Sequence, residues 1–192
     1  MRKWLSLALL ALILNGRAAQ AQGMEAPADV QVPLLFKILT FDRKLADRVP
    51  GDDIVIAILF QAEYHPSMRA RDQVVEALTD MLGSTISGHP VRWVLLELRD
   101  AASLRSALKR SQVAVIYVTP FRGLDLRFIT EVARAEGITT FTGVPTYVEE
   151  GLALGIGIDD ERPQIIVNIS AARAEGSDFT SQLLRVSRVV EH

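Results

Sequence analysis

The chain contains few residues of the types that catalyse reactions or bind metals. Its three histidines are His65, His89 and His192, and it has no cysteine. His65 lies two residues after Glu63 in an expected loop, and His89 precedes a proline, so neither has the spacing of a helical zinc site. Because loop histidines are usually solvated, the pattern favours neither a metal site nor a histidine base.

Two further motifs have simple structural explanations. Gly155-Ile156-Gly157 is a G-x-G motif without a third glycine, and it lies within an expected strand, so it is not a phosphate-binding loop. Asp159, Asp160 and Glu161 would attract a cation, yet charged residues also solvate a hairpin tip. Neither a G-x-S-x-G motif nor a P-loop lysine occurs. An enzyme is therefore the least favoured class, and no catalytic residue, metal or cofactor is expected.

The stronger candidate for a binding site is a crevice at the carboxyl ends of the expected strands. An open parallel sheet places ligands where its strand order reverses, here between the ends of strands 54–60 and 113–118. Glu63 and Arg122 are expected to pair across this crevice. Polar loops vary freely in such folds, so the same residues also have a purely structural explanation. The residues expected to bind a partner or a solute are Gln61, Glu63, Tyr64, Thr119, Phe121, Arg122, Phe141 and Tyr147.

Alternating strands and helices are expected to position these loops. Near-continuous apolar runs, typical of strands buried on both faces, occur at 54–60, 91–98, 113–118 and 138–141. Helical periodicity predicts helices at 32–49, 68–82, 100–111, 124–136 and 146–150. The alternation predicts an α/β fold with a flavodoxin-like open, mostly parallel sheet of order 2-1-3-4-5 and helices on both faces.

Residues 151–190 predict a C-terminal β-hairpin followed by a helix. Apolar runs at 152–158 and 164–169 flank a charged tip, which indicates an antiparallel hairpin with its last strand at the sheet edge. Ser177 or Asp178 is a suitable cap for a final helix. The apolar residues at helical spacing in that helix are Phe179, Leu183, Leu184, Val186, Val189 and Val190.

The N-terminus has the pattern of a secretory signal peptide. Arg2 and Lys3 precede an apolar run at 4–14 that is too short to span a bilayer, and Ala19-Gln20-Ala21 is a small-residue cleavage site. We expect cleavage after Ala21 and export to the periplasm, with a retained anchor as the alternative. A flexible leader is then expected over 22–31 and a single α/β domain over 32–192.

The net charge of the chain limits the kinds of partner that it can bind. The net charge of −2 becomes −5 when the signal peptide leaves, because Arg2, Lys3 and Arg17 leave with it. A mildly acidic surface argues against nucleic acid and anionic lipid, since both require a basic patch. No apolar run after the signal peptide is long enough to span a membrane.

The chain resembles the YfiR-like periplasmic proteins of bacteria from about Pro33 to Val190. Their C-terminal pattern is a glycine-led apolar strand, an acidic turn, a strand with an Ile-Asn pair, an Ala-Ala-Arg segment and a Ser-x-Leu-Leu-Arg helix. The matching segments here are Gly151-Leu152-Ala153-Leu154, Asp159-Asp160-Glu161, Val167-Asn168-Ile169, Ala171-Ala172-Arg173 and Ser181-Gln182-Leu183-Leu184-Arg185. The chain departs from the family in loop 61–66, where other members often have a Gly-Asp-Pro-Phe-like turn, and at Glu150-Gly151, where they often have paired glycines.

The resemblance implies a non-enzymatic periplasmic regulator. Such proteins bind the periplasmic part of an inner-membrane signalling enzyme, a diguanylate cyclase of cyclic-di-GMP signalling or a sensor kinase, and hold it inactive. The family fold is also similar to one lobe of a periplasmic solute-binding protein, so a small-solute-binding or transport-accessory protein is the alternative. A homodimer is left open.

Each of these classes predicts a different surface. A regulator is expected to expose an apolar patch, near Leu35 and Phe41 or on the final helix. A solute binder is expected to have a closed pocket with convergent polar groups. An enzyme would instead show a perturbed carboxylate or histidine in that pocket.

Overall fold

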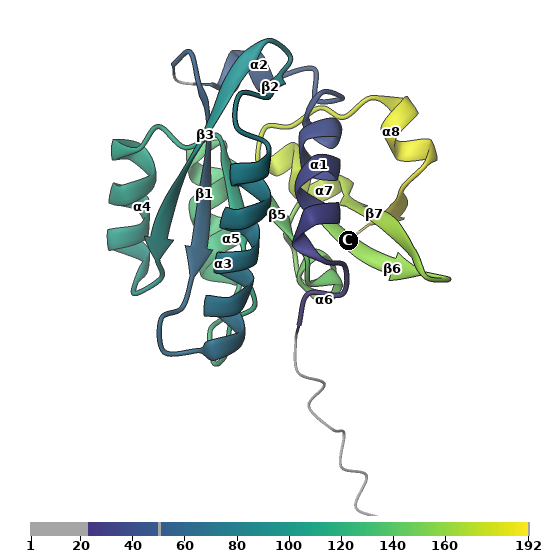
Figure 1. The fold of residues 1–192 in the computed structure, drawn as a ribbon. Helices are drawn as coiled ribbons and strands as arrows, with labels where there is room; N and C mark the ends of the chain where they lie inside the picture. The colour runs from purple at the N-terminus through teal and green to yellow at the C-terminus, as the bar shows by residue number, and fades with distance from the viewer. Residues whose placement is uncertain (1–22, 50, 192) are drawn as a thin grey trace, which may run out of the picture.

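In the described part of the chain, one sheet of eight strands lies between two layers of helices in the computed structural model (Figure 1). The structure describes residues 23–49 and 51–191. The expected signal peptide and its cleavage site therefore lie outside the described residues. No helix in the described part of the chain is long and apolar enough to cross a membrane.

The central strands have the predicted order and direction. In chain order the strands are β1 (Ile54–Phe60), β2 (Thr85–Ile86), β3 (His89–Glu97), β4 (Val115–Val118), β5 (Thr139–Thr142), β6 (Leu154–Asp159), β7 (Arg162–Asn168) and β8 (Arg188–Val190). Across the sheet they follow β2-β3-β1-β4-β5-β6-β7-β8. The parallel neighbours β3, β1, β4, β5 and β6 reproduce the order 2-1-3-4-5, which confirms the flavodoxin-like α/β class. The predicted hairpin strand β7 joins the sheet, and the sheet is wider than predicted because β2 and β8 extend it.

The two faces of β1 show how the sheet is buried. Successive side chains of a strand point to opposite faces. Ile54, Ile56 and Ile58 pack into the apolar core on one side, and Val55 and Leu59 pack into the core on the other. A run of apolar residues without polar alternation is therefore what this central position requires.

The helices divide between the two faces. Helices α1, α3, α7 and α8 share the core of Ile54, while α4, α5 and α6 contribute to the core of Val55. Figure 1 shows α1 and α3 side by side on one face of the sheet. Their bounds are α1 (Ala28–Leu39), α2 (Leu45–Arg48), α3 (His65–Asp80), α4 (Ala101–Arg110), α5 (Arg127–Glu136), α6 (Pro145–Glu149), α7 (Ile169–Ala174) and α8 (Ser181–Arg185).

The first helix differs from the prediction at both ends. It begins at Ala28, so residues 28–31 belong to α1 and not to the flexible leader expected over 22–31. The prediction treated Pro33 as a first-turn proline, but Pro33 lies inside the helix. The helix also ends at Leu39, where the Thr40, Phe41 and Asp42 nitrogens donate to carbonyls three residues earlier. The Asp42 side chain then accepts a hydrogen bond from the Lys44 nitrogen at 3.0 Å and forms a turn before α2. The predicted helix 32–49 is therefore two helices, α1 and α2.

The C-terminal hairpin is confirmed, and the helix after it is much shorter than predicted. Strands β6 and β7 pair antiparallel around Asp160 and Glu161, whose φ angles of 44° and 62° are typical of a tight type I′ turn. Helix α8 ends at Arg185, and Val189 pairs with Val167 in the parallel strand β8. The antiparallel strand β7 is thus internal, not at the edge. Val189 and Val190 matched helical spacing by coincidence, and these β-branched residues favour the extended strand, whereas Val186 is the C-cap of α8.

Candidate functional site

The two loops of the predicted crevice, after β1 and after β4, are joined by hydrogen bonds. The Gln61 amide donates to the Arg122 carbonyl at 3.2 Å, and the Arg122 nitrogen donates to the Gln61 side-chain oxygen at 3.0 Å. Beneath them the Ser67 hydroxyl accepts from the Gln61 nitrogen at 2.8 Å and lies 2.7 Å from the Thr119 hydroxyl. Thr119 in turn donates to the Leu59 carbonyl at 2.9 Å. Thr119 is therefore part of a buried polar chain that positions the loops.

The aromatic residues of the prediction are core residues. The Tyr147 hydroxyl accepts from the Phe121 nitrogen at 2.8 Å and donates to the Phe121 carbonyl at 3.2 Å, and both side chains are buried. Burial raises the pKa of Tyr147 above its usual value. Phe141 is fully buried and packs against Tyr117 with 5.3 Å between ring centres. The expectation that Phe121, Phe141 and Tyr147 form an accessible wall is corrected, because the core needs their apolar area.

Four of the eight predicted residues reach the surface. Glu63 and Arg122 are exposed, and Gln61 and Tyr64 are half-buried. Within the described residues no ion pair joins Glu63 to Arg122, so the expected pairing is absent. The structure brings these four residues together as a polar rim at the carboxyl ends of β1 and β4, which we call the crevice rim. Whether the crevice rim binds a partner or a solute stays a prediction.

The remaining sequence candidates have structural roles. The His89 ring lies 3.0 Å from the Asp52 carbonyl oxygen, and Asp160 and Glu161 are exposed in the hairpin turn. Among the residues that the structure describes, no group of three histidine, aspartate or glutamate side chains could hold a metal ion. A Cβ atom on Gly155 would lie 2.6 Å from a methyl carbon of Val148. Gly155 is thus required for close packing of α6 on β6.

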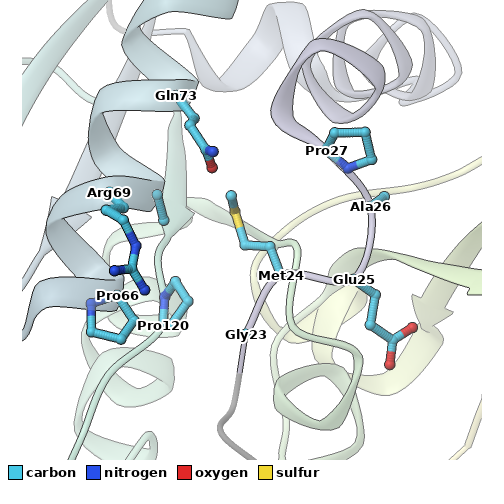
Figure 2. Close-up of a pocket in the computed structure, with 10 residues that line it drawn as sticks. Gly23, Met24, Glu25, Ala26, Pro27, Pro66, Arg69, Gln73 and Pro120 are labelled. Atoms are coloured by element: carbon cyan, nitrogen blue, oxygen red, sulfur yellow. The ribbon is translucent and has the colours of Figure 1, made fainter.

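An N-terminal segment crosses the carboxyl edge of the sheet beside the crevice. The Glu25 nitrogen donates to the Gly143 carbonyl at 3.1 Å, and the Glu25 carboxylate accepts from the Ile158 nitrogen at 3.0 Å. Between this segment and the first turns of α3 lies a hollow of about 390 Å³ (Figure 2). Figure 2 shows Met24 between the two walls, with Arg69 and Gln73 on the α3 side. The sequence did not indicate this hollow, because it depends on a segment expected to be loose.

A second surface lies at the C-terminal end of the sheet. Ile158, Val186 and Val189 are 39%, 70% and 38% exposed. Val186 lines a hollow of about 490 Å³ together with Pro163, which pairs with Ile158 across the hairpin. We call Ile158, Pro163, Val186 and Val189 the C-terminal surface. Leu35, named above as a candidate for an exposed apolar patch, is fully buried instead.

Arg48 is the centre of a buried polar cluster that sequence analysis missed. It forms an ion pair with Asp42, which is itself buried, and donates to the hydroxyls of Thr139 and Ser177 at 3.0 Å each. It also donates to the Gly137 carbonyl at 2.9 Å. The cluster joins α2, the start of β5 and the loop after α7. The only sequence signal was the occurrence of charged residues beside apolar runs, which is too common to be specific.

Glu175 lies beside this cluster and is completely buried. Burial raises its pKa to about 8, although hydrogen bonds from Thr140 and the charges of Arg134 and Arg48 oppose the rise. The Thr140 hydroxyl also accepts from the Ala153 nitrogen at 2.8 Å. Glu175 therefore ties the loop after α7 to two neighbouring segments at the edge of the sheet opposite the crevice rim.

Three solved structures share this fold at low sequence identity. An ABC domain from Streptococcus pneumonia, solved in complex with L-Trp, superposes with a TM-score of 0.54 at 11% identity, covering 80% of this chain and 62% of that one. A conserved domain protein from Vibrio cholerae O1 biovar El Tor has a TM-score of 0.54 at 13% identity, with coverages of 87% and 60%. A ligand-free, open substrate-binding protein with adhesive properties from Clostridium difficile has a TM-score of 0.52 at 15% identity, with coverages of 77% and 57%.

These likenesses establish the fold alone. The chain spans about three fifths of the length of the solved proteins it matches. No curated protein matches it.

The family assignment comes from a separate comparison. A family model described as YfiR/HmsC-like matches residues 28–188, which is nearly all of the part described by the structure. The match begins at the first residue of α1 and ends at the first residue of β8. The chain belongs to the YfiR/HmsC-like family.

Proposed function

We propose that this protein is a periplasmic, non-enzymatic regulator. It binds the periplasmic part of an inner-membrane signalling enzyme, a diguanylate cyclase of cyclic-di-GMP signalling or a sensor kinase, and holds that enzyme inactive. The single observation that carries this proposal is the family match over residues 28–188. The signal-peptide pattern of residues 1–21 supports the periplasmic location.

The mechanism is a shift of population between two states of the enzyme. A protein that binds only the inactive state lowers the active fraction, and it does so by no more than its difference in affinity for the two states. The regulator itself then needs a contact surface and no catalytic group.

The C-terminal surface supports a role in protein–protein contact. Its exposed apolar residues lie on the last strands and beside the end of α8, and charged residues surround Val186, because Asp159, Asp160 and Arg162 line the same hollow. An exposed apolar side chain gains free energy when a partner removes it from water. Strand β8 has β7 on one side and no strand on the other among the described residues. An unpaired strand edge offers backbone donors and acceptors to a partner. We assign the docking of the membrane enzyme to this surface.

The crevice rim is the second candidate contact. Gln61, Glu63, Tyr64 and Arg122 lie at the strand-order reversal, where open α/β sheets bind ligands. The likeness of the fold to solute-binding structures favours an alternative function there, the binding of a small solute.

Crosslinking in cells tests the proposal. The tagged protein is crosslinked in vivo, and the proteins attached to it are identified from detergent-solubilised inner membrane. We expect a membrane enzyme with a periplasmic segment. The absence of any membrane enzyme, in cells where a known periplasmic pair crosslinks efficiently, would contradict the regulator function and favour the solute binder.

A further inference from the structure

A groove between α3 and the start of α1 has opposite charges at its two ends. The hollow of about 390 Å³ described above contains Arg69 and Gln73, and a second hollow of about 320 Å³ contains Gln73, Glu76 and Asp80. Pro27 and Gln73 line both, so the two hollows lie next to each other along α3. The groove thus runs from a cationic end to an anionic end.

The charged residues form one stripe along α3. Arg69, Gln73, Glu76 and Asp80 are spaced by four, three and four residues, which places them on one face of a helix. Asp29, in the first turn of α1, faces the same anionic end from the other wall. With a rise of about 1.5 Å per residue, Arg69 is separated from Glu76 by about 10 Å and from Asp80 by about 16 Å along the axis.

These five polar side chains are not used by the fold. Within the described residues, none of them forms a side-chain hydrogen bond or an ion pair. Glu25, which also lines the groove, is occupied by its hydrogen bond from Ile158, and Figure 2 shows its carboxylate directed away from Arg69. The guanidinium and the carboxylates at the two ends therefore remain available to a ligand.

The charges of the groove are complementary to a short peptide chain with an ammonium group at one end and a carboxylate at the other. A guanidinium pairs with a carboxylate, and the three carboxylates at the other end pair with an ammonium group. Between them the Gln73 amide can donate to and accept from one peptide group. Met24, Pro27, Ala70 and Ala77 supply the apolar part of the walls. An extended chain rises about 3.3–3.6 Å per residue, so three to five residues span about 10–16 Å.

We propose that this groove binds a short peptide of about three to five residues with both termini free. Its carboxylate lies at Arg69 and its ammonium group at Glu76, Asp80 and Asp29. The site is separate from the C-terminal surface, and it goes beyond the regulator function because it requires no membrane partner.

Calorimetric titration of the exported protein with three probes tests the proposal. The probes are tetra-alanine, tetra-alanine amide, which lacks the carboxylate charge, and N-acetyl-tetra-alanine, which lacks the ammonium group. We expect tetra-alanine to bind saturably and each capped peptide to bind about tenfold more weakly, a difference of about 1.4 kcal/mol. No saturable binding of tetra-alanine, or equal affinity for all three probes, would overturn the proposal.

Two variants assign the termini to the two ends of the groove. Arg69→Gln is expected to weaken tetra-alanine about tenfold and to leave tetra-alanine amide unchanged. Glu76→Gln is expected to weaken tetra-alanine and to leave N-acetyl-tetra-alanine unchanged. Arg110→Gln, at an exposed arginine on α4, is the matched control and should leave all three affinities unchanged. An Arg69→Gln variant that folds normally and binds tetra-alanine like the wild type would also overturn the assignment.

Discussion

The carboxylate of Glu175 accepts two hydrogen bonds from Thr140, one from its backbone nitrogen at 2.7 Å and one from its hydroxyl at 2.8 Å. This pair fixes the loop after α7 to the beginning of β5. Burial dominates the electrostatics and raises the pKa of Glu175 from 4.5 to about 8. The folded state therefore keeps a proton that the unfolded state releases.

The raised pKa of Glu175 predicts that stability falls as pH rises. Between pH 4.5 and 8 the folded protein binds more protons at this residue than the unfolded chain. The free energy of unfolding then decreases with pH, with a limiting slope of about 1.4 kcal/mol per pH unit. Glu175→Gln removes this titration and should flatten the dependence, since an amide can make both contacts with Thr140. Urea denaturation across this range measures the effect.

The control for Glu175 is Glu131→Gln, at an exposed position of α5. It should leave the pH dependence of the wild type unchanged. If Glu175→Gln and the wild type lost stability equally between pH 4.5 and 8, the buried carboxyl would not be the source of the dependence.

Leu183 is the buried residue of α8 and should not tolerate a charge. Leu183→Asp is expected to lower the free energy of unfolding by about 4 kcal/mol or more, because an unpaired carboxylate would replace a core side chain. Gln182→Asp, at the exposed neighbouring position, should change stability by less than about 0.5 kcal/mol. Thermal melting followed by circular dichroism distinguishes the two, and equal melting temperatures would show that α8 does not pack on the core.

Gly155 should be required for the packing of α6 on β6. Gly155→Ala brings the new methyl group to 2.6 Å from Val148, so one segment must move, and we expect a loss of about 1–3 kcal/mol. At Gly51 the nearest atom to an added methyl group is 3.6 Å away, and Gly51→Ala should have little effect. Urea denaturation of both variants measures the difference; an unaffected Gly155→Ala variant would mean that the two segments separate easily.

The crevice rim can be tested without disturbing the core. Arg122→Glu reverses an exposed charge and should change stability by less than about 0.5 kcal/mol, whereas Phe121→Ala removes a buried ring and should cost about 3–5 kcal/mol. Arg122→Glu is therefore the informative variant. We expect it to weaken repression of the partner enzyme, measured as cellular cyclic-di-GMP or kinase output. If a normally folded Arg122→Glu protein repressed the enzyme as the wild type does, the crevice rim would be excluded as a contact for the partner enzyme.

The central strands of the sheet were predicted more accurately than the two terminal segments of the chain. Continuous apolar runs such as 54–60 have one stable environment, a strand buried on both faces, and the strand order followed from the alternation with helices. The termini failed because their local signals were ambiguous. Pro33 was expected in a first helical turn and lies inside the helix, and Val189 and Val190 match helical spacing while favouring a strand.

The candidate site was predicted only in part, again because local sequence signals were ambiguous. The loops after β1 and β4 were placed correctly, but sequence alone could not distinguish aromatic side chains that face solvent from those that complete the core. Phe121 and Tyr147 lie in the apolar core, where the Tyr147 hydroxyl forms hydrogen bonds with the Phe121 backbone. The groove of Arg69 and Glu76 required the position of residues 23–29, which no periodicity indicated.

The most direct test of the central claim compares two exposed apolar positions. Val186 belongs to the C-terminal surface, whereas Leu82, which is 67% exposed, lies after α3 and is the matched control. Val186→Asp and Leu82→Asp are each expressed in cells, and the yield of the crosslinked membrane enzyme is measured together with its activity. We predict that Val186→Asp loses the crosslink and activates the enzyme, while Leu82→Asp behaves like the wild type. Full crosslinking and repression by a folded Val186→Asp protein would contradict docking through the C-terminal surface.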